Sequence, residues 1–506
     1  MSKHAPRKKR RTITILHPDL GIGGAERLIL DIALALQARG HKVKIYTSHR
    51  DRSHCFEEAR DGTLDVTVRG NTVFPDQIAG RFRVLFAVLR QVHLVVWLLM
   101  ARERERGREG DAVDMRNRNE VGDDDDEKEE EEEEEEEDVY IVDQVPACVP
   151  ILKTFGRLFS KARGKQRILF YCHFPDQLLA KRDEGGVMRQ LIKACYRYPF
   201  DWFEGWAISA ADKVVANSKF TCGVIRQVFG DRFGDVRVVY PCVDTGIKDL
   251  GKLVEGKSLW GGKKILLSIN RFERKKDIGL AIRAYHGLGE EGRHGTRLVI
   301  AGGYDNRVQE NVQYHTELDD LATGLGLRTA TSKTVISALS IPDSIEVLFL
   351  LSVPSAFKQT LLSAATLLVY TPSYEHFGIV PVEAMRVGLP VLAVNNGGPL
   401  ETIIEGKTGW LRGANAIEEW TAVMRKVLWE MDAHEAAVIG ANGKERVEKE
   451  FSLQAMGDRL AAEIEDMFDK DARPFLGLWR VFLFGVAILG LVIAVLVAAF
   501  TKLRIK

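Results

Sequence analysis

The sequence predicts a chain of two doubly wound α/β domains in series, followed by a membrane-spanning helix. Three observations lead to this prediction. Apolar runs without strict alternation, typical of buried parallel strands, alternate with helical segments along most of the 506 residues. A glycine-rich linker at residues 241–262 interrupts this alternation, which then starts again. Near the end of the chain, residues 481–500 form an apolar run of 20 residues without a charge.

The length and the charge of the chain limit the class of protein to which it can belong. A chain of 506 residues is too long for one typical core and suits two large domains with additions. The 71 Lys and Arg residues equal the 71 Asp and Glu residues in number, but residues 120–138 contain 16 of the acids. The rest of the chain therefore carries an excess of bases, which indicates anionic partners such as phosphates, nucleotides or lipid head groups. The six cysteines lie far apart without a CxxC pair, so we expect neither a disulfide scaffold nor a cysteine-rich zinc site.

The two ends of the sequence predict a cytosolic chain with a tail anchor. Residues 1–11 form a basic N-terminal arm and contain no secretory apolar region, so the bulk of the chain is expected in the cytosol. A nuclear signal is the alternative for this arm. Residues 476–500 are expected to form the transmembrane helix, because a helix of this length crosses a hydrocarbon core of about 30 Å. A hairpin or a re-entrant segment is the alternative to the tail anchor.

The first domain is expected at residues 12–240. An amphipathic helix is predicted to begin near Ala25 and to end at Gly40, because glycine ends helices well. Residues 82–100 are apolar but contain two arginines, which predicts an amphipathic helix lying on a membrane or, equally, a core helix. Residues 101–138 form an acidic, low-complexity insert that we expect to be disordered. The strands of this domain are predicted at residues 12–16, 43–47, 139–142, 168–172, 214–216 and 236–240.

The second domain is expected at residues 263–432, and a C-terminal helical region follows at residues 433–472. Two such domains in series imply a cleft between them. Because ligands bind open parallel sheets beyond the carboxyl ends of the strands, candidate site residues are sought just after the predicted strands. The strands of this domain are predicted at residues 264–269, 298–301, 346–351, 366–370 and 391–394.

Two motifs of the first domain follow predicted strands. The glycine-rich turn at residues 21–26 stands between a strand and a helix, where backbone N–H groups of Gly23 and Gly24 can approach an anion. It matches neither GxGxxG nor a P-loop, and such turns are often only structural. His173 follows the strand at 168–172 within the motif YCHFPD, at the edge where the cleft would lie. A lone histidine is more often structural than functional.

The second domain carries two further motifs. The first is a basic loop, NRFERKKD at residues 270–277, whose arginine fork and lysine charge suit a pyrophosphate; a solvated basic loop is the alternative. The second is EHFGIVPVE, with Glu375 in a loop after a strand and Glu383 about one turn into the following helix. The free N–H groups at the start of that helix, near Gly378, suit a phosphate. Carboxylates beside it can accept hydrogen bonds from sugar hydroxyls.

The two glutamates with seven residues between them, together with Phe377-Gly378, GLPV at 388–391 and GGPLE at 397–401, resemble the retaining glycosyltransferases of family 4. The resemblance covers about residues 12–465, apart from the acidic insert. It implies the GT-B architecture, in which two Rossmann-like domains face a cleft and the second holds the nucleotide-sugar donor. The motifs GIGGAER, YCHFPD, INRFERKKDI and AGGYDNRV are similar to the branch of mannosyltransferases that assembles dolichol-linked oligosaccharides in the endoplasmic reticulum.

The resemblance also implies roles for individual residues. Arg271 and Lys276 would bind the donor diphosphate, with Lys275 as the alternative lysine. Backbone groups that would border the phosphates belong to Gly23, Gly24, Phe377, Gly378 and Ile379.

The remaining roles concern the sugar and the ribose. Glu375 would contact the donor mannose, and Glu383 would hold the ribose hydroxyls. His173 would lie at the sugar and assist positioning or stabilise the leaving group. No metal and no cofactor are expected, because arginine, lysine and a helix end can stabilise the departing diphosphate.

For this branch the resemblance implies a retaining hexosyltransferase that uses GDP-mannose. It would add the second (α-1,3) and third (α-1,6) mannoses to mannosyl-chitobiosyl-pyrophosphoryl-dolichol on the cytosolic face of the endoplasmic reticulum, in N-glycan precursor synthesis. The implied partners are the dolichol-pyrophosphate-linked oligosaccharide, lipid of that membrane and other mannosyltransferases of the pathway, but no nucleic acid. Two alternatives remain open: another membrane-bound family 4 enzyme, such as one that transfers from UDP-N-acetylglucosamine to phosphatidylinositol, or an inactive GT-B scaffold. Front-face substitution and double displacement also both remain open.

Overall fold

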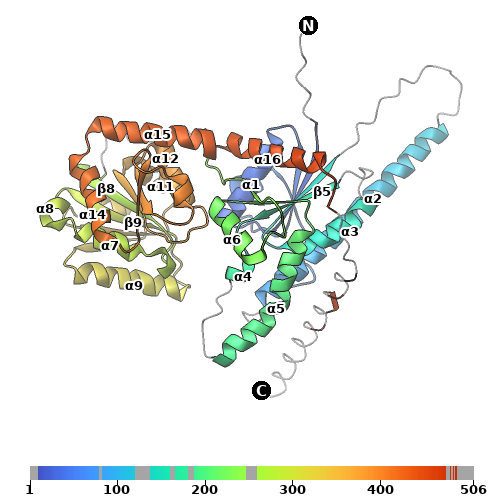
Figure 1. Cartoon of the computed structure of the whole chain (residues 1–506), viewed down its shortest axis with the longest axis horizontal. Coiled ribbons are helices and arrows are strands. Elements are labelled where there is room, and N and C mark those ends of the chain that lie inside the picture. Colours follow the sequence, from blue (N-terminus) through green and yellow to red (C-terminus); the bar gives the residue numbers. More distant parts are fainter. Residues whose placement is uncertain are drawn as a thin grey trace, which may run out of the picture. The chain divides into compact units, whose positions relative to one another are not determined.

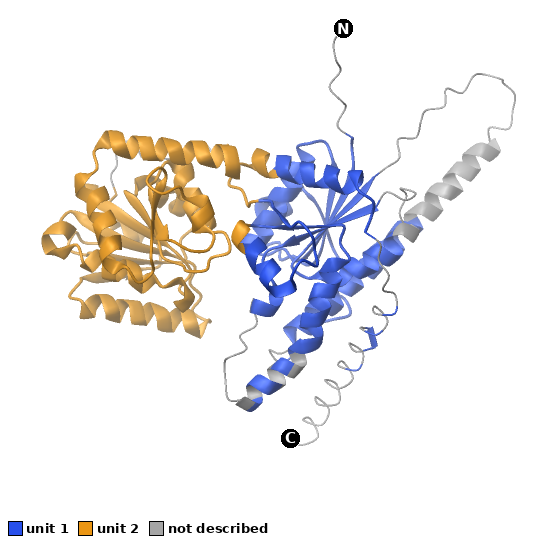
Figure 2. Ribbon diagram, in the orientation of Figure 1, with its two compact units in different colours: residues 1–217, 221–239, 457–506 blue, residues 218–220, 240–456 orange. Residues whose placement is uncertain are grey.

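The computed structural model divides the chain into two compact units. Unit 1 comprises residues 1–217, 221–239 and 457–506, and unit 2 comprises residues 218–220 and 240–456 (Figures 1 and 2). Each unit contains a seven-stranded sheet in which every strand pair is parallel. The structure describes residues 9–78, 82–119, 137–159, 166–179, 187–246 and 259–473, with isolated positions at 479, 483, 485, 486 and 490.

The sheet of unit 1 has the strand order β3-β2-β1-β4-β5-β6-β7. Every strand predicted for this domain is present, although the one expected at 236–240 is only two residues long. The strand β3 was not predicted, because its four residues are too short to show a hydrophobic pattern. The strands are β1 (Thr12–Asp19), β2 (Lys42–His49), β3 (Asp65–Val68), β4 (Asp138–Asp143), β5 (Gln166–Cys172), β6 (Lys213–Ala216) and β7 (Arg237–Val238).

Helices pack against this sheet and against one another. The predicted first helix is α1 (Gly24–Gln37), and Gly40 just beyond it adopts a left-handed φ of 85°, which favours glycine. The others are α2 (Arg83–Asn119), α3 (Val149–Phe159), α4 (Asp176–Leu179), α5 (Val187–Ser209), α6 (Lys219–Phe229) and α16 (Leu453–Asp469).

The apolar segment at 82–100 forms the first part of α2. Leu94 and Leu98 are fully buried in the cluster that packs on the sheet, and Leu85 is buried in a second cluster with Trp206 of α5. Among the described residues, Arg83–Arg104 is the helix whose length and composition would allow it to cross a membrane, yet 44% of its most apolar window is buried inside the protein. Its buried face supports the core-helix alternative over a helix that lies on a membrane.

The prediction of a disordered insert at residues 101–138 is wrong for both of its ends. Helix α2 continues to Asn119, since alanine, arginine, glutamate and methionine favour helix and opposite charges recur three residues apart. Arg102 ties the helix to the sheet, because it donates to Asp138 Oδ2 at 3.1 Å and to Thr14 Oγ1 at 2.9 Å. Asp138 opens β4, and the preceding Glu137 is buried. Residues 120–136 lie outside the described part of the chain.

Helix α16 belongs to unit 1 from Gly457 onward, although the helix α15 (Ala433–Phe451) before it belongs to unit 2. It supplies carboxylates and carbonyls to bases buried at the amino edge of the first sheet. Arg11 Nη2 donates to Glu465 at 2.7 Å, and Lys213 Nζ lies 2.7 Å from Glu463. The region expected as one helical segment at 433–472 is thus two helices that serve different units.

The sheet of unit 2 has the strand order β10-β11-β9-β8-β12-β13-β14. All five strands predicted for this domain are present. The edge strands β10 and β14 were not predicted, because four residues of mixed polarity give no clear pattern. The strands are β8 (Lys264–Ile269), β9 (Thr296–Gly302), β10 (Thr329–Ser332), β11 (Val347–Leu351), β12 (Leu367–Tyr370), β13 (Val391–Val394) and β14 (Gly409–Arg412).

Helices contact one another on both faces of this sheet: α7, α9 and α14 form one set, and α11, α12 and α15 the other. The core cluster includes the fully buried Trp420 of α14 and Tyr285 of α7. The helices are α7 (Ile278–His286), α8 (Gly289–Arg293), α9 (Gln309–Gly324), α10 (Val335–Leu339), α11 (Ser355–Ala364), α12 (Ile379–Val387), α13 (Pro399–Thr402) and α14 (Ile417–Arg425).

Two predicted segments fall largely outside the described residues. The transmembrane helix expected at 476–500 is described only at isolated positions, so it stays a prediction. Of the linker expected at 241–262, residues 247–258 are not described. Before that gap, Val243 pairs with Ser452 through an isolated bridge, and this pairing lies within unit 2.

Candidate functional site

The carboxyl edge of the second sheet brings the basic loop and the glutamate loop together. Strand β8 ends at Ile269, and the loop after it closes in a single helical turn, Arg274–Lys276. Lys276 points back to the loop that follows β12, where its ammonium group forms an ion pair with Glu375. The hydroxyl of Thr371 donates to the carbonyl of Lys276 at 2.7 Å and joins the same two loops. Two residues that stand 99 positions apart are thereby paired.

Glu375 is a mostly buried carboxylate held in its ionised form. Burial alone would raise the pKa of Glu375, but the ammonium group of Lys276 and hydrogen bonds from Lys276 and the Tyr370 hydroxyl lower it overall. Burial and the neighbouring carboxylate raise the pKa of Tyr370 well above its usual range, so the phenol remains a donor. The arrangement fixes a negative oxygen pair at the sheet edge, suited to accept hydrogen bonds from sugar hydroxyls.

The loop that carries Glu375 rests directly on the GGPLE segment. A Cβ atom on Gly398 would lie 2.1 Å from the carbonyl oxygen of Phe377, and one on Gly397 would lie 2.6 Å from that of Glu375. The N–H of Gly398 donates to the Glu375 carbonyl at 2.7 Å. The two glycines are therefore required, because a side chain at either position would clash with the backbone of the loop that carries Glu375. Their close approach fixes the position of that loop.

Helix α12 begins at the predicted position. Gly378 is its N-cap, with φ of 82°, and a Cβ there would lie 3.3 Å from the Tyr370 ring. The N-terminal N–H groups of a helix have no intrahelical partner and favour an anion, as the sequence predicts. The side chain of Phe377 is buried and stacks with Tyr240, so it serves packing, and only its backbone is available to a ligand.

Glu383 lies one turn into α12 and faces α11. Lys358 Nζ lies 2.6 Å from its carboxylate and donates to Oε1. Oε2 is buried and lies at the same distance of 2.6 Å from Lys358 Nζ, so both carboxylate oxygens of Glu383 contact that ammonium group. Lys358 was not among the predicted site residues, because no motif surrounds it in the sequence.

Arg271 and Lys275 are less constrained than Lys276. Their side chains are 65% and 72% exposed, and both lie close to Glu273, at 3.8 Å and 3.0 Å. Lys276, by contrast, is 17% exposed. The structure therefore separates the two adjacent lysines: Lys276 belongs to the Glu375 network and Lys275 does not.

The carboxyl edge of the first sheet carries a second polar cluster. His173, directly after β5, donates from Nε2 to Asp143 Oδ2 at 2.9 Å. Asp143 ends β4, and its carboxylate also accepts from His17 Nδ1 of β1 at 2.8 Å. His17 was expected in a loop after the first strand, but β1 extends to Asp19 and buries it. Neither His17 nor Asp143 was predicted as a site residue.

At the glycine-rich turn before α1, a side chain from the first turn of that helix fills the space beside Gly23. Gly23 is the N-cap, and a Cβ there would lie 2.2 Å from Oε2 of Glu26, whose carboxylate folds back over the turn. Gly24 has open space around its Cβ position. In this structure the anion at Gly23 is thus a carboxylate of the protein itself, while Gly24 leaves room for another group.

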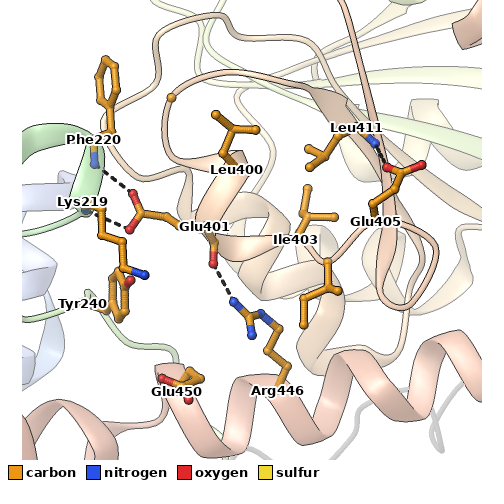
Figure 3. A pocket seen from close by; sticks show the side chains of 12 residues that line it. Lys219, Phe220, Tyr240, Leu400, Glu401, Ile403, Glu405, Leu411, Arg446 and Glu450 are labelled. Atoms are coloured by element: carbon orange, nitrogen blue, oxygen red, sulfur yellow. Dashed lines mark hydrogen bonds between the residues drawn. The ribbon is translucent and has the colours of Figure 1, made fainter. Parts of the chain in front are cut away.

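A cavity of about 850 Å³ lies beside the GGPLE segment in unit 2, with Leu400, Ile403 and Tyr240 in its wall (Figure 3). The carboxylate of Glu401 accepts from the backbone N–H groups of Lys219 and Phe220, at 2.8 and 3.2 Å. None of Lys276, Glu375 and Glu383 lines this cavity. Its polar groups are engaged in holding the chain, so the candidate site is the Glu375 network.

Two family models match the chain. Residues 254–446 match the family described as Glycosyl transferases group 1, and residues 133–246 match Glycosyltransferase Family 4. The chain is 46% identical over 481 residues to Alpha-1,3/1,6-mannosyltransferase alg-2 of Neurospora crassa, covering 93% of this chain and 94% of the relative. It is 41% identical to Alpha-1,3/1,6-mannosyltransferase ALG2 of Saccharomyces cerevisiae, covering 94% and 88%.

Solved structures share the fold at low identity. Sucrose-phosphate synthase from Thermosynechococcus elongatus matches with a TM-score of 0.60 at 18% identity, covering 91% of this chain and all of that one. Anabaena Alr3699/HepE in complex with UDP matches with a TM-score of 0.57, also at 18% identity, covering 90% of this chain and all of that one. The expected fold class of two Rossmann-like domains is thereby confirmed.

Proposed function

Because this chain belongs to the α-1,3/1,6-mannosyltransferase family of glycosyltransferases, we propose that its donor is GDP-mannose and its acceptor mannosyl-chitobiosyl-pyrophosphoryl-dolichol. It would add the second mannose through an α-1,3 linkage and the third through an α-1,6 linkage, with retention of configuration. The observation that carries this proposal is the half-buried Lys276–Glu375 ion pair, which would combine a phosphate-binding cation with a sugar-binding carboxylate.

Unit 2 would bind the donor through groups at its sheet edge. Lys276 would neutralise the diphosphate, together with the N-terminal N–H groups of α12 and the exposed fork of Arg271. Glu375 would accept hydrogen bonds from the mannose hydroxyls, and the Glu383 carboxylate would accept them from the ribose. As GDP departs, these fixed positive groups would stabilise the developing charge on its phosphate.

Unit 1 would act through His173. Its Nε2 is engaged by Asp143, so Nδ1 is the ring atom that would contact the reacting groups. We propose that it positions the sugar or the leaving group, as a hydrogen-bonding group and not as a nucleophile. Front-face substitution needs no enzyme nucleophile beneath the anomeric carbon, and it fits a site whose carboxylate Glu375 is already paired with a lysine.

The location we propose is the cytosolic face of the endoplasmic reticulum. Residues 476–500 would anchor the chain, and the basic residues 1–11 would favour an anionic lipid surface. Anchoring raises the effective concentration of an acceptor that is itself confined to the bilayer. Other mannosyltransferases of the same pathway would then share this membrane.

Product mass tests the proposal directly. Purified full-length protein in liposomes is given GDP-mannose and a pyrophosphate-lipid acceptor that carries one mannose on chitobiose. We expect the acceptor to gain one hexose and then a second. Transfer from UDP-N-acetylglucosamine to phosphatidylinositol, with none from GDP-mannose, would contradict the proposal. A folded protein that transfers from neither donor would favour an inactive scaffold.

We further propose that the reaction requires no metal ion, because Lys276, Arg271 and the start of α12 supply the positive charge. Transfer should continue unchanged after the protein is treated with EDTA and the chelator is kept in the assay. The matched control adds magnesium or manganese to untreated protein, which should not increase the rate. A loss of transfer on chelation that either metal restores would contradict this expectation.

A further inference from the structure

Three polar side chains from adjacent parallel strands meet at the carboxyl edge of the first sheet. The order β1-β4-β5 places His17, Asp143 and His173 beside one another. His17 Nδ1 lies 2.8 and 2.9 Å from the two carboxylate oxygens of Asp143, and His173 Nε2 lies 2.9 Å from Oδ2. His17 and Asp143 are 0% exposed, whereas His173 is 19% exposed. The cluster thus has a buried end and one end that reaches solvent.

The chemistry of a carboxylate fixes the protons in this cluster. An ionised carboxylate only accepts hydrogen bonds, so both histidine nitrogens that face Asp143 must carry hydrogen. His173 is therefore protonated at Nε2, and its Nδ1 carries no hydrogen in the neutral ring. None of the described residues forms a hydrogen bond to His173 Nδ1 in the structure. Asp143 consequently selects the tautomer of His173 and leaves one defined nitrogen free for the reactants.

His17 supplies the charge that balances Asp143. Burial opposes a charge on His17, but the Asp143 carboxylate outweighs burial and raises the pKa of His17. Burial likewise would raise the pKa of Asp143, yet the two histidines hold it below its ordinary value. The other titratable groups that act on this pair are Glu26 of α1 and the buried thiol of Cys148. An imidazolium–carboxylate pair of His17 and Asp143, with His173 as a second donor to the carboxylate, is the arrangement that satisfies these groups.

We infer that His17 is a positioning residue for mannosyl transfer, which acts through Asp143 to hold His173 as the Nε2–H tautomer with Nδ1 available to the reactants. This inference rests on the proposed role of His173 in the transfer. It assigns His17 a task beyond packing, because its fully buried ring is held against the same carboxylate that contacts His173.

The first variant removes the charge of His17 but keeps a donor. In His17→Gln, the amide can still donate to Asp143, but the carboxylate loses its cationic partner. We expect kcat to fall about tenfold to a hundredfold, as for other residues that orient a functional histidine, with KM for GDP-mannose unchanged.

A double-mutant cycle separates positioning from packing. If His17 acts only through His173, His17→Gln should cause no further loss of kcat in a His173→Ala background. Equal losses of kcat in both backgrounds would overturn the inference. His41→Gln is the matched control, since His41 is a partly buried histidine that accepts a hydrogen bond from Arg11 N at the opposite, amino edge of the same sheet. That variant should retain the kcat of the wild type.

The second variant tests the tautomer. The amide of Asp143→Asn can donate, so one histidine can turn an unprotonated nitrogen toward it, and the proton of His173 can move to Nδ1. In serine hydrolases the same replacement lowers kcat by about 10⁴ through the wrong tautomer. We expect a loss of at least a hundredfold here, while an unfolding transition near that of the wild type would show that the fold persists. An Asp143→Asn variant with wild-type kcat would overturn the inference.

A spectroscopic measurement makes the test independent of turnover. The protein contains 12 histidines, and ¹⁵N-histidine labelling with the His17→Gln and His173→Gln variants assigns the two signals. We expect a doubly protonated His17 and an Nε2–H tautomer for His173 near pH 7. A neutral His17 or an Nδ1–H tautomer would refute the inference whether or not mannose is transferred. Absence of transfer with the expected shifts would instead refute the proposed function.

Discussion

Replacing Glu375 by glutamine should abolish mannosyl transfer while the protein stays folded. The carboxylate is held ionised by Lys276 and accepts a hydrogen bond from Tyr370, so its negative charge is built into the site. Glutamine keeps the shape but loses that charge and presents a donor to the sugar hydroxyls. We expect kcat to fall by about 10³ or more, the size of effect seen when a preorganised electrostatic group is removed. Mass spectrometry of the lipid-linked product measures the loss.

Glu317→Gln is the matched control for this variant. Glu317 also pairs with a base of the same helical turn, since Arg274 Nε donates to it at 3.1 Å, but its side chain is half exposed and lies on α9. Its removal should leave transfer near the wild-type rate, because an exposed ion pair contributes little. Equal losses in Glu317→Gln and Glu375→Gln would show that the basic turn, and not the buried carboxylate, is the sensitive element.

The second large effect is expected at the adjacent lysines. Lys276→Met removes the half-buried cation that we assign to the diphosphate, whereas Lys275→Met removes an exposed one paired with Glu273. We expect kcat/KM to fall more than about a hundredfold for Lys276→Met, since a buried cation lost from a phosphate site is worth about 3 kcal/mol or more. Lys275→Met should change it by less than about threefold, as for a surface ion pair. The reverse order would identify Lys275 as the donor-binding lysine.

Lys276→Met should also change the pH dependence of the residual activity. Lys276 is what lowers the pKa of Glu375 against the effect of burial. Without that ammonium group, burial dominates and the pKa of Glu375 rises. The residual transfer should therefore be lost at a higher pH, on acidification, than transfer by the wild type. A pH–rate profile with an unchanged acid limb would show that the charge of Glu375 does not depend on Lys276.

The strands were predicted from the sequence because both sheets are parallel and covered on both faces. Buried strands of this kind are continuous apolar runs, as in ILLSI at 265–269 and VLFLL at 347–351. The short edge strands β3, β10 and β14 were missed, since an edge strand has one uncovered side and mixed polarity. Helix α2 was misjudged beyond Met100, where the charged composition masked good helix formers and the anchoring contact of Arg102 is not visible in the sequence.

The residues that meet at the candidate site could be predicted where they share one motif and were missed where they do not. Glu375 and Glu383 stand in a single motif, and Lys276 lies in another directly after a strand. Asp143 and Lys358, in contrast, act through partners 30 and 25 residues away in sequence. A carboxylate at the end of a predicted strand was the signal for Asp143, since it lies on the same sheet edge as His173. No local pattern indicates Lys358, because its role depends on how α11 packs against α12.

The return of α16 to the first unit has a consequence for synthesis of the chain. Arg11, Arg167 and Lys213 are buried bases of unit 1, and they bond to groups between Glu463 and Lys470. A ribosome releases these partners only after all of unit 2 has emerged. The first unit must therefore remain unfinished, with its charged amino edge uncovered, until the second unit is complete. Fragments that stop at residue 239 should consequently aggregate. In the full-length enzyme, unit 2 should complete its folding before unit 1 does.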